Sequence, residues 1–221
     1  HFVDLVPSLL AVLRSDATGV DRQGAAQGLA EVLAGLGMER MENLLPEIIN
    51  SASDPKPYVR EGHISLLIYL PATFGHRFAP HLGRIIPPIL SGIADEAETV
   101  REASMRAGRM IIANYSSKAV DLLLPHLETG LFDEAWRIRM SSLQLTADLL
   151  FRLSGISGKN EVEDEGVDED MEQSAANNSV QRALVEALGQ ERRDRILASI
   201  YIVRQDPNIP VRQAAIHTWK A

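Results

Sequence analysis

The feature that most constrains the fold is a recurring pair, an aspartate followed six residues later by an arginine. An aliphatic residue precedes the arginine in four of the five copies, and a small residue always stands two places after it. The five pairs are Asp16 and Arg22, Asp54 and Arg60, Asp95 and Arg101, Asp133 and Arg139, and Asp206 and Arg212. Successive arginines are 38, 41, 38 and 73 residues apart. Self-similarity at a fixed period predicts a protein built of stacked structural repeats.

The period indicates the kind of repeat. A unit of about 40 residues containing two helices is typical of HEAT and armadillo repeats. Apolar residues follow each arginine at helical spacing, and the composition, rich in aliphatic residues with only 5% aromatics, favours helices. We therefore expect an all-α fold, an α-solenoid of about five HEAT repeats, each an antiparallel helix pair. The expected pairs are 2–14 with 20–36, 41–53 with 57–70, 78–94 with 98–114, 119–132 with 135–153, and 191–204 with 209–221.

The 73-residue spacing contains one acidic segment, residues 160–179, with eight acids and no base. The formal net charge of −8 comes from this segment, because the remaining 22 acidic and 22 basic residues balance. Such a composition buries little apolar area and predicts a disordered insertion. The expected organisation is repeats one to four in 1–159, the acidic loop in 160–179, and a short helix at 180–188 followed by the fifth repeat within 180–221. A partner-docking or charge-screening role for the loop is the alternative.

The five Asp–Arg pairs invite two interpretations. An acid–base or anion site would need only a single copy, whereas five equally spaced copies are expected of a structural role. We expect each aspartate in the turn between paired helices, where it can cap the second helix or accept from an arginine. Stacked repeats would then place the aspartate of one unit near the arginine of the next, which forms a structural ladder.

Few other residues suggest chemistry. The chain has no cysteine, its six histidines are scattered, and no phosphate-binding loop or nucleophile motif is present. We expect no enzyme activity, no cofactor, no metal site and no small-molecule substrate, and no apolar run approaches the length of a membrane span. The densest basic stretch offers Arg192, Arg193 and Arg195 as candidate contacts to a partner or to RNA. The alternative is an exposed helix face in which they pair with Glu191 and Asp194.

Four stretches, "DRQGAAQGLAEVLAGLG", "GLFDEAWRIRMSS", "ERRDRILASIYIVRQD" and "VRQAAIHTWK", resemble the general control non-derepressible one family. Its members are very large HEAT-repeat activators of the kinase that phosphorylates the α subunit of translation initiation factor two. The resemblance implies a cytoplasmic scaffold in the amino-acid starvation response, which meets translating ribosomes and the kinase through the full-length protein.

The resemblance also implies an excerpt of a longer array, with adjoining HEAT repeats at both ends. Neither end of the chain carries the polar outer helix that caps a solenoid, so self-association through the end faces is expected. A nuclear-transport receptor or phosphatase scaffold built of similar repeats is the alternative function.

Overall fold

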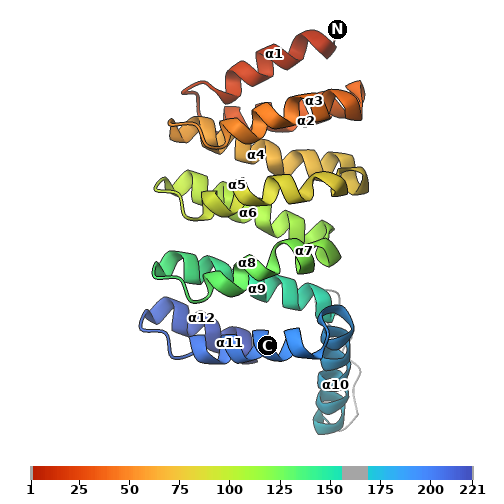
Figure 1. The fold of residues 1–221 in the computed structure, drawn as a ribbon, viewed down its shortest axis with the longest axis vertical. Helices are drawn as coiled ribbons and strands as arrows, with labels where there is room; N and C mark the ends of the chain where they lie inside the picture. Colours follow the sequence, from red (N-terminus) through yellow and green to blue (C-terminus); the bar gives the residue numbers. More distant parts are fainter. Residues whose placement is uncertain (1, 156–168, 221) are drawn as a thin grey trace. The chain divides into compact units, whose positions relative to one another are not determined.

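The structure, a computed structural model, describes residues 2–155 and 169–220. Over these residues the chain forms helices joined by short turns, with no strand, which confirms the predicted all-α class. The chain divides into two compact units, His1–Tyr115 and Ser116–Ala221, and each is described by itself. Within each unit the helices stack as antiparallel pairs, as expected for HEAT repeats (Figure 1).

Unit 1 contains three helix pairs. They are α1 (Phe2–Leu13) with α2 (Gly19–Leu36), α3 (Met38–Ser51) with α4 (Pro57–Phe74), and α5 (Leu82–Ile93) with α6 (Glu98–Asn114), with the 3-10 helix η1 (Gly75–His81) between α4 and α5. The second helices of the pairs stack on one another, because α4 packs against both α2 and α6. As the central element, α4 buries nearly its whole middle part, including Ile64, Leu67 and Leu70.

Unit 2 contains the remaining elements. They are α7 (Ser116–Leu122), α8 (Leu124–Gly130), α9 (Trp136–Ser154), α10 (Glu169–Leu188), α11 (Gln190–Val203) and α12 (Ile209–Lys220). The helix α9 is central here, since it packs against α8, α10 and α12. Leu143 and Leu149 of α9 are buried, as are Ile196 and Ile200 of α11.

Two predicted helices are interrupted, and proline explains both interruptions. The helix expected at 119–132 breaks at Leu123 into α7 and α8, and Pro125 stands in the first turn of α8, where its missing N–H costs nothing. The helix expected from residue 78 becomes regular only at Leu82. Before it, η1 contains Pro80, and Gly75 ends α4 with a φ of 60°.

The helix expected at 180–188 is longer than predicted. It begins at Glu169, so residues 169–179 of the acidic segment belong to α10, whereas 160–168 lie outside the described residues. The sequence between 171 and 176 contains Met, Glu, Gln and two Ala, all strong helix formers, and Leu184 and Leu188 anchor the far half by burial. Deleting 160–179 would therefore also remove the first half of α10. Among the described helices, none is both long and apolar enough to cross a bilayer.

Candidate functional site

The aspartate of the repeated pair shapes the turn between paired helices. Its Oδ1 atom accepts a hydrogen bond from the backbone N–H two residues later, which is an Asx turn leading into the second helix. Four of the five turns have this bond: Asp54 with Lys56 (2.9 Å), Asp95 with Ala97 (2.9 Å), Asp133 with Ala135 (2.8 Å) and Asp206 with Asn208 (2.8 Å). This hydrogen bond holds the carboxylate in one orientation independently of any arginine.

The arginine closes the same turn from the second helix. Its Nη1 donates to the backbone oxygen of the aspartate six residues earlier, in Arg60 (2.9 Å), Arg101 (2.9 Å), Arg139 (2.8 Å) and Arg212 (3.4 Å). The first three also donate to the next carbonyl along the chain. These bonds satisfy carbonyl groups beyond the end of the first helix and fix the guanidinium, leaving Nε and Nη2 for another partner.

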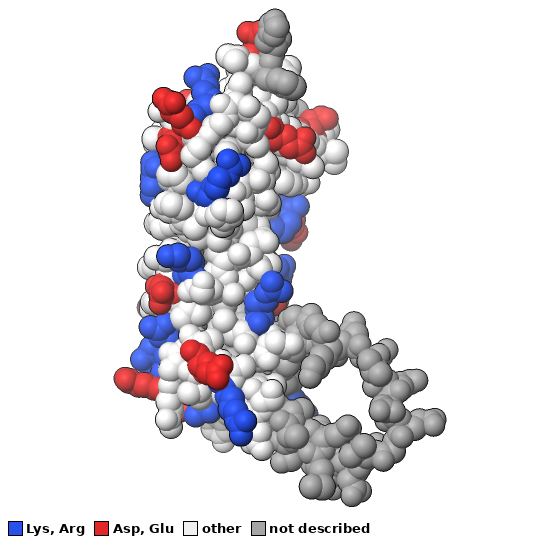
Figure 2. Space-filling model, turned by 90° about the vertical axis from the view of Figure 1, so that its right-hand side faces the viewer, with Lys and Arg blue, Asp and Glu red and all other residues white. Residues whose placement is uncertain are grey.

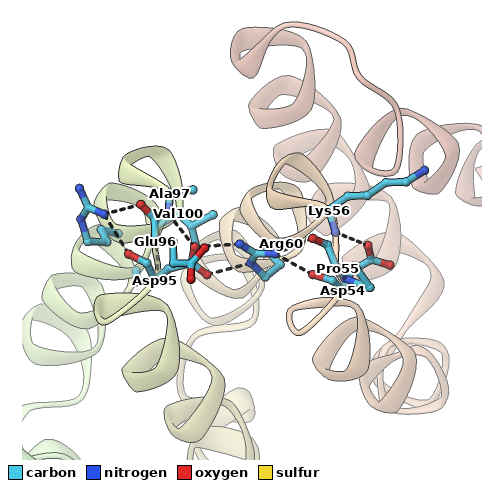
Figure 3. Close-up of polar contacts among 10 residues, drawn as sticks. Asp54, Pro55, Lys56, Arg60, Asp95, Glu96, Ala97 and Val100 are labelled. Carbon is cyan, nitrogen blue, oxygen red and sulfur yellow. Dashed lines mark hydrogen bonds and ion pairs between the residues drawn. The ribbon is translucent and has the colours of Figure 1, made fainter.

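For Arg60, drawn in Figure 3, and for Arg139, that partner is the aspartate of the following helix pair. In unit 1, Arg60 Nε lies 2.8 Å from Asp95 Oδ2, and Nη2 lies 2.9 Å from Oδ1. In unit 2, Arg139 binds Asp206 in the same two-pronged manner, at 2.7 and 3.0 Å. The four side chains are 5–17% exposed. Paired parallel hydrogen bonds between charged groups are among the stronger polar contacts in proteins, so each pair joins one hairpin to the next.

The electrostatics follow from these contacts. Burial acts to raise the pKa of the Asp95 carboxyl, but the hydrogen bond from Arg60, the N–H of Ala97 and the arginine charge outweigh it, so the pKa is lowered. The hydrogen bond from Arg139 likewise lowers the pKa of Asp206, against the opposing effect of burial. Both carboxylates are ionised at neutral pH, and each of their oxygens already accepts a hydrogen bond, as a structural role requires.

The first step of the ladder differs from the expectation. Arg22 does not meet Asp54; its Nη2 lies 2.8 Å from Glu61 Oε2, with both side chains less than 10% exposed. Asp54 instead lies 3.7 Å from Nη1 of Arg14. The cause is a differently built turn: Asp16 is exposed, and Arg22 donates to the carbonyls of Ser15 and Ala17.

Glu61 is the residue that reasoning from the sequence missed. It follows the arginine of its own repeat, a position also held by Glu102 in the third repeat, where the side chain is exposed. The sequence signal for its role is the departure of the first copy, in which Asp21 replaces the aliphatic residue before Arg22. Thr18 caps α2 there by accepting from the Asp21 N–H at 3.2 Å.

Gly62, the small residue two places after Arg60, allows close helix contact, whereas an added Cβ on Gly24, two places after Arg22, would meet nothing within 4 Å. A Cβ atom on Gly62 of α4 would lie only 2.8 Å from the backbone oxygen of Leu13, at the end of α1. Any larger residue would separate these two helices. The second copy of the motif therefore provides both a polar link, through Arg60, and a steric contact, through Gly62, between hairpins.

The basic stretch lies on α11, and its charges are paired within unit 2. Arg192 Nη1 lies 3.7 Å from Asp121 Oδ1, and Arg195 binds Glu128 through two bonds of 2.8 and 3.3 Å. Arg193 contacts Asp194 and the side-chain oxygen of Gln181. On the face shown in Figure 2, basic side chains are scattered among acidic and uncharged ones. The three arginines thus resemble a solvated, internally paired face more than a phosphate-binding surface.

Within residues 3–155 and 177–220, whose side chains the structure describes, no three His, Asp or Glu side chains are grouped closely enough to hold a metal ion. His63 is buried on α4, and His81 lies 3.0 Å from Glu42 across two repeats. The arrangement thus provides rigid stacking and an exposed surface.

Comparison with known proteins agrees with this geometry. The family described as EF3 N-terminal HEAT repeat matches residues 22–153. The chain is 50% identical to "Stalled ribosome sensor GCN1" of Homo sapiens over 99% of its length, and 47% identical to "eIF-2-alpha kinase activator GCN1" of Saccharomyces cerevisiae over all of it. It spans only 8% of the length of each of these relatives. A match to "Elongation factor 3" of Gonapodya prolifera, at 26% identity, covers 66% of the chain and 14% of that protein.

These relatives confirm the resemblance found in the four sequence stretches. The family match covers more than half of the chain and extends from the first ladder arginine to the end of α9. The chain belongs to the EF3 N-terminal HEAT-repeat family.

Proposed function

We propose that this chain is a non-catalytic scaffold segment of a ribosome-associated activator of the translation initiation factor two α kinase, and that it acts in the cytoplasm during amino-acid starvation. One observation carries the proposal: about half of the residues are identical, over the full chain, to proteins named as a stalled ribosome sensor and a kinase activator. The relatives with 40–50% identity do not favour a nuclear-transport receptor or a phosphatase scaffold.

The structure supports a mechanical role for the segment. Charged side chains of the repeated motif form ion pairs between hairpins, as in Arg60 with Asp95 and Arg139 with Asp206. Stacked hairpins present an extended surface whose form depends on small rotations between repeats. A scaffold of this kind holds a ribosome and a kinase in a productive geometry without any reaction of its own.

The test uses the full-length protein in cells that lack their own copy. Cross-linking on ribosomes, with sites mapped to residues 2–220, measures direct engagement of the segment. In parallel, the double variant Arg60→Ala/Arg139→Ala breaks the ladder in both units, and phosphorylation of initiation factor two α after starvation is measured. We expect reduced phosphorylation at unchanged protein level.

The control is Glu96→Ala, an exposed acid beside the ladder, which should leave signalling intact. Full kinase activation by the ladder variant, together with an absence of cross-links from this segment, would contradict the proposal. Hydrolase or nucleotidase turnover by the purified protein would contradict its non-catalytic part.

A further inference from the structure

We infer that the turns of unit 2 form a docking surface for a second copy of the same chain, and that each copy presents the same side chains to the other. We call this surface the apolar edge. It is defined by one apolar side chain at each end of each of the two turns, namely Phe132, Trp136, Ile202 and Ile209. The inference goes beyond the proposed function, because it assigns a binding surface and its occupant.

The α8–α9 turn and the α11–α12 turn carry the apolar edge, and both lie at the same end of their hairpins, at the left in Figure 1. Trp136 is the first residue of α9, and Ile209 is the first residue of α12. Arg139 stands three residues after Trp136 and binds Asp206 of the next hairpin through two hydrogen bonds. Asp206 in turn stands three residues before Ile209. The ion pair thus fixes the two turns to each other, and a rigid support lowers the entropy cost of binding.

The four side chains of the apolar edge are in contact with solvent. Phe132 is 54% exposed and Trp136 is 39% exposed. Ile202 and Ile209 are 58% and 56% exposed. Exposed apolar side chains that gather in one place are typical of protein–protein interfaces, where tryptophan is also enriched among the residues that contribute most to binding.

The exposure belongs to these positions of the repeat and does not result from a missing neighbour. Trp136 is exposed although α12 packs against α9. Counted from the ladder aspartate, Ile209 corresponds to Pro57, which is exposed although another hairpin follows it in unit 1. Ile202 likewise corresponds to Asn50 of α3, which is exposed too. A hairpin that follows therefore leaves these positions open.

Unit 1 has other residue types at the positions of Phe132, Trp136 and Ile209. They are small residues, a proline or an acid: Ser15, Gly19, Ser53, Pro57, Ala94 and Glu98. The repeat folds without a large apolar side chain at these positions, so folding does not account for the apolar edge, and binding does.

The charges beside the apolar edge identify its occupant. Glu134 and Arg137 flank Trp136, and both are exposed. Among the described residues, the Glu134 carboxylate has no partner, and the Arg137 guanidinium contacts only the Trp136 ring, whose centre lies 4.9 Å away. Asp133, the other acid of this turn, already accepts a hydrogen bond from the Ala135 N–H.

An apolar surface that carries one free carboxylate and one free guanidinium is complementary to itself. In a two-fold arrangement, Glu134 of each copy meets Arg137 of the other, and the apolar side chains pack between the two contacts. RNA would need an excess of positive charge, which the apolar edge lacks.

Charge reversal in the full-length protein tests the inference. Two copies with different affinity tags are purified free of ribosomes, treated with nuclease and mixed, and co-precipitation is measured. Glu134→Arg in both copies, or Arg137→Glu in both, places like charges at both contacts and should lower co-precipitation at least about tenfold. A Glu134→Arg copy mixed with an Arg137→Glu copy has opposite charges at both contacts and should regain the wild-type level. Recovery on mixing also shows that both variants are folded.

The matched control is Arg152→Glu, at an exposed arginine near the other end of α9, which should leave co-precipitation unchanged. A photoreactive p-benzoylphenylalanine at position 209 gives a second readout, and we expect it to cross-link to unit 2 of a second copy. At position 98, the corresponding exposed position of the α5–α6 turn, it should give no such cross-link.

Three results would overturn the inference and leave the proposed function standing. The first is wild-type protein that does not co-precipitate with itself. The second is co-precipitation that neither charge reversal changes, as association through the end faces would give. The third is a cross-link from position 209 to RNA or to a different protein.

Discussion

Gly92 on α5 and Ser104 on α6 lie so close that a Cβ atom on the glycine would come within 3.0 Å of the Ser104 Cβ atom, and closer still to its Oγ. Gly130 and Ser142 repeat this contact between α8 and α9, also at 3.0 Å. Each glycine stands three residues before a ladder aspartate, and each serine stands three residues after a ladder arginine. The repeat thus encodes the crossing point of its two helices as well as its polar link.

The first prediction concerns this crossing point. Gly92→Ala should lower the free energy of unfolding by about 1–3 kcal/mol, because the added methyl group has no space and the helices must move apart. The control is Gly83→Ala in the same helix, where an added Cβ meets nothing within 4 Å. That change should be neutral or stabilise by up to about 1 kcal/mol through helix propensity. Urea denaturation followed by circular dichroism measures both, and equal effects would refute the packing argument.

The second prediction concerns the ladder. Asp95→Ala should lower stability by about 1–3 kcal/mol, since it leaves the largely buried Arg60 guanidinium without its carboxylate. A double-mutant cycle with Arg60→Ala separates the pair from other effects, and a coupling energy above about 0.5 kcal/mol is expected for groups in direct contact. Glu96→Ala is the matched control at the neighbouring exposed acid. Denaturation curves that do not distinguish Asp95→Ala from Glu96→Ala would count against a stapling role.

The sequence alone was sufficient for the helix class, the number of hairpins and most helix ends. These depend on local signals, namely the spacing of apolar residues and the recurrence of the Asp–Arg pair with a small residue after each arginine. It was also sufficient to place Asp95 near Arg60, because every stacked repeat offers the same geometry.

Other features depend on tertiary contacts that a single repeat does not show. Arg22 prefers Glu61 to Asp54 because the first turn holds its guanidinium by different carbonyls. The helix α10 begins earlier than predicted because its buried second half supports the helix, and the residues before that half have high helix propensity. The acidic composition of this segment suggests a loop instead. The pairing of Arg195 with Glu128 links positions 67 residues apart, which spacing within one helix does not indicate.

The third prediction concerns the basic stretch on α11. Arg192, Arg193 and Arg195 each contact an acidic side chain, so we expect only weak RNA binding by these residues, which about 0.2 M salt should abolish. Replacing all three by Gln in the full-length protein should leave co-sedimentation with ribosomes in that salt unchanged. Filter binding at two salt concentrations measures the RNA affinity. If the wild type binds RNA tightly at the higher salt and the triple variant does not, the three arginines form an RNA-binding surface.

The fourth prediction concerns His63 and acid pH. The side chain is 0% exposed on α4; Nδ1 lies 2.8 Å from the Val59 carbonyl and therefore carries the proton, while Nε2 is buried without a partner among the described residues. Burial lowers the pKa of His63, and the positive charge of Arg14 adds to this effect. The Val59 carbonyl and the carboxylates of Glu47 and Asp54 oppose it.

The direction of the pH effect follows from that lowered pKa. Because the folded-state pKa lies below the ordinary value of about 6.5, the unfolded chain takes up the proton first as pH falls, so stability is lost from about pH 6.5 downward until the folded pKa is reached. The loss approaches about 1.4 kcal/mol per pH unit for one proton. His63→Ser, with the residue that α6 and α9 carry at this position, should flatten the dependence between pH 7.5 and 5.5, whatever its absolute stability. His217→Ser, at an exposed position of α12, should retain the wild-type slope. Urea midpoints at constant ionic strength measure these slopes, and a His63→Ser variant as acid-sensitive as the wild type would assign the effect to other groups.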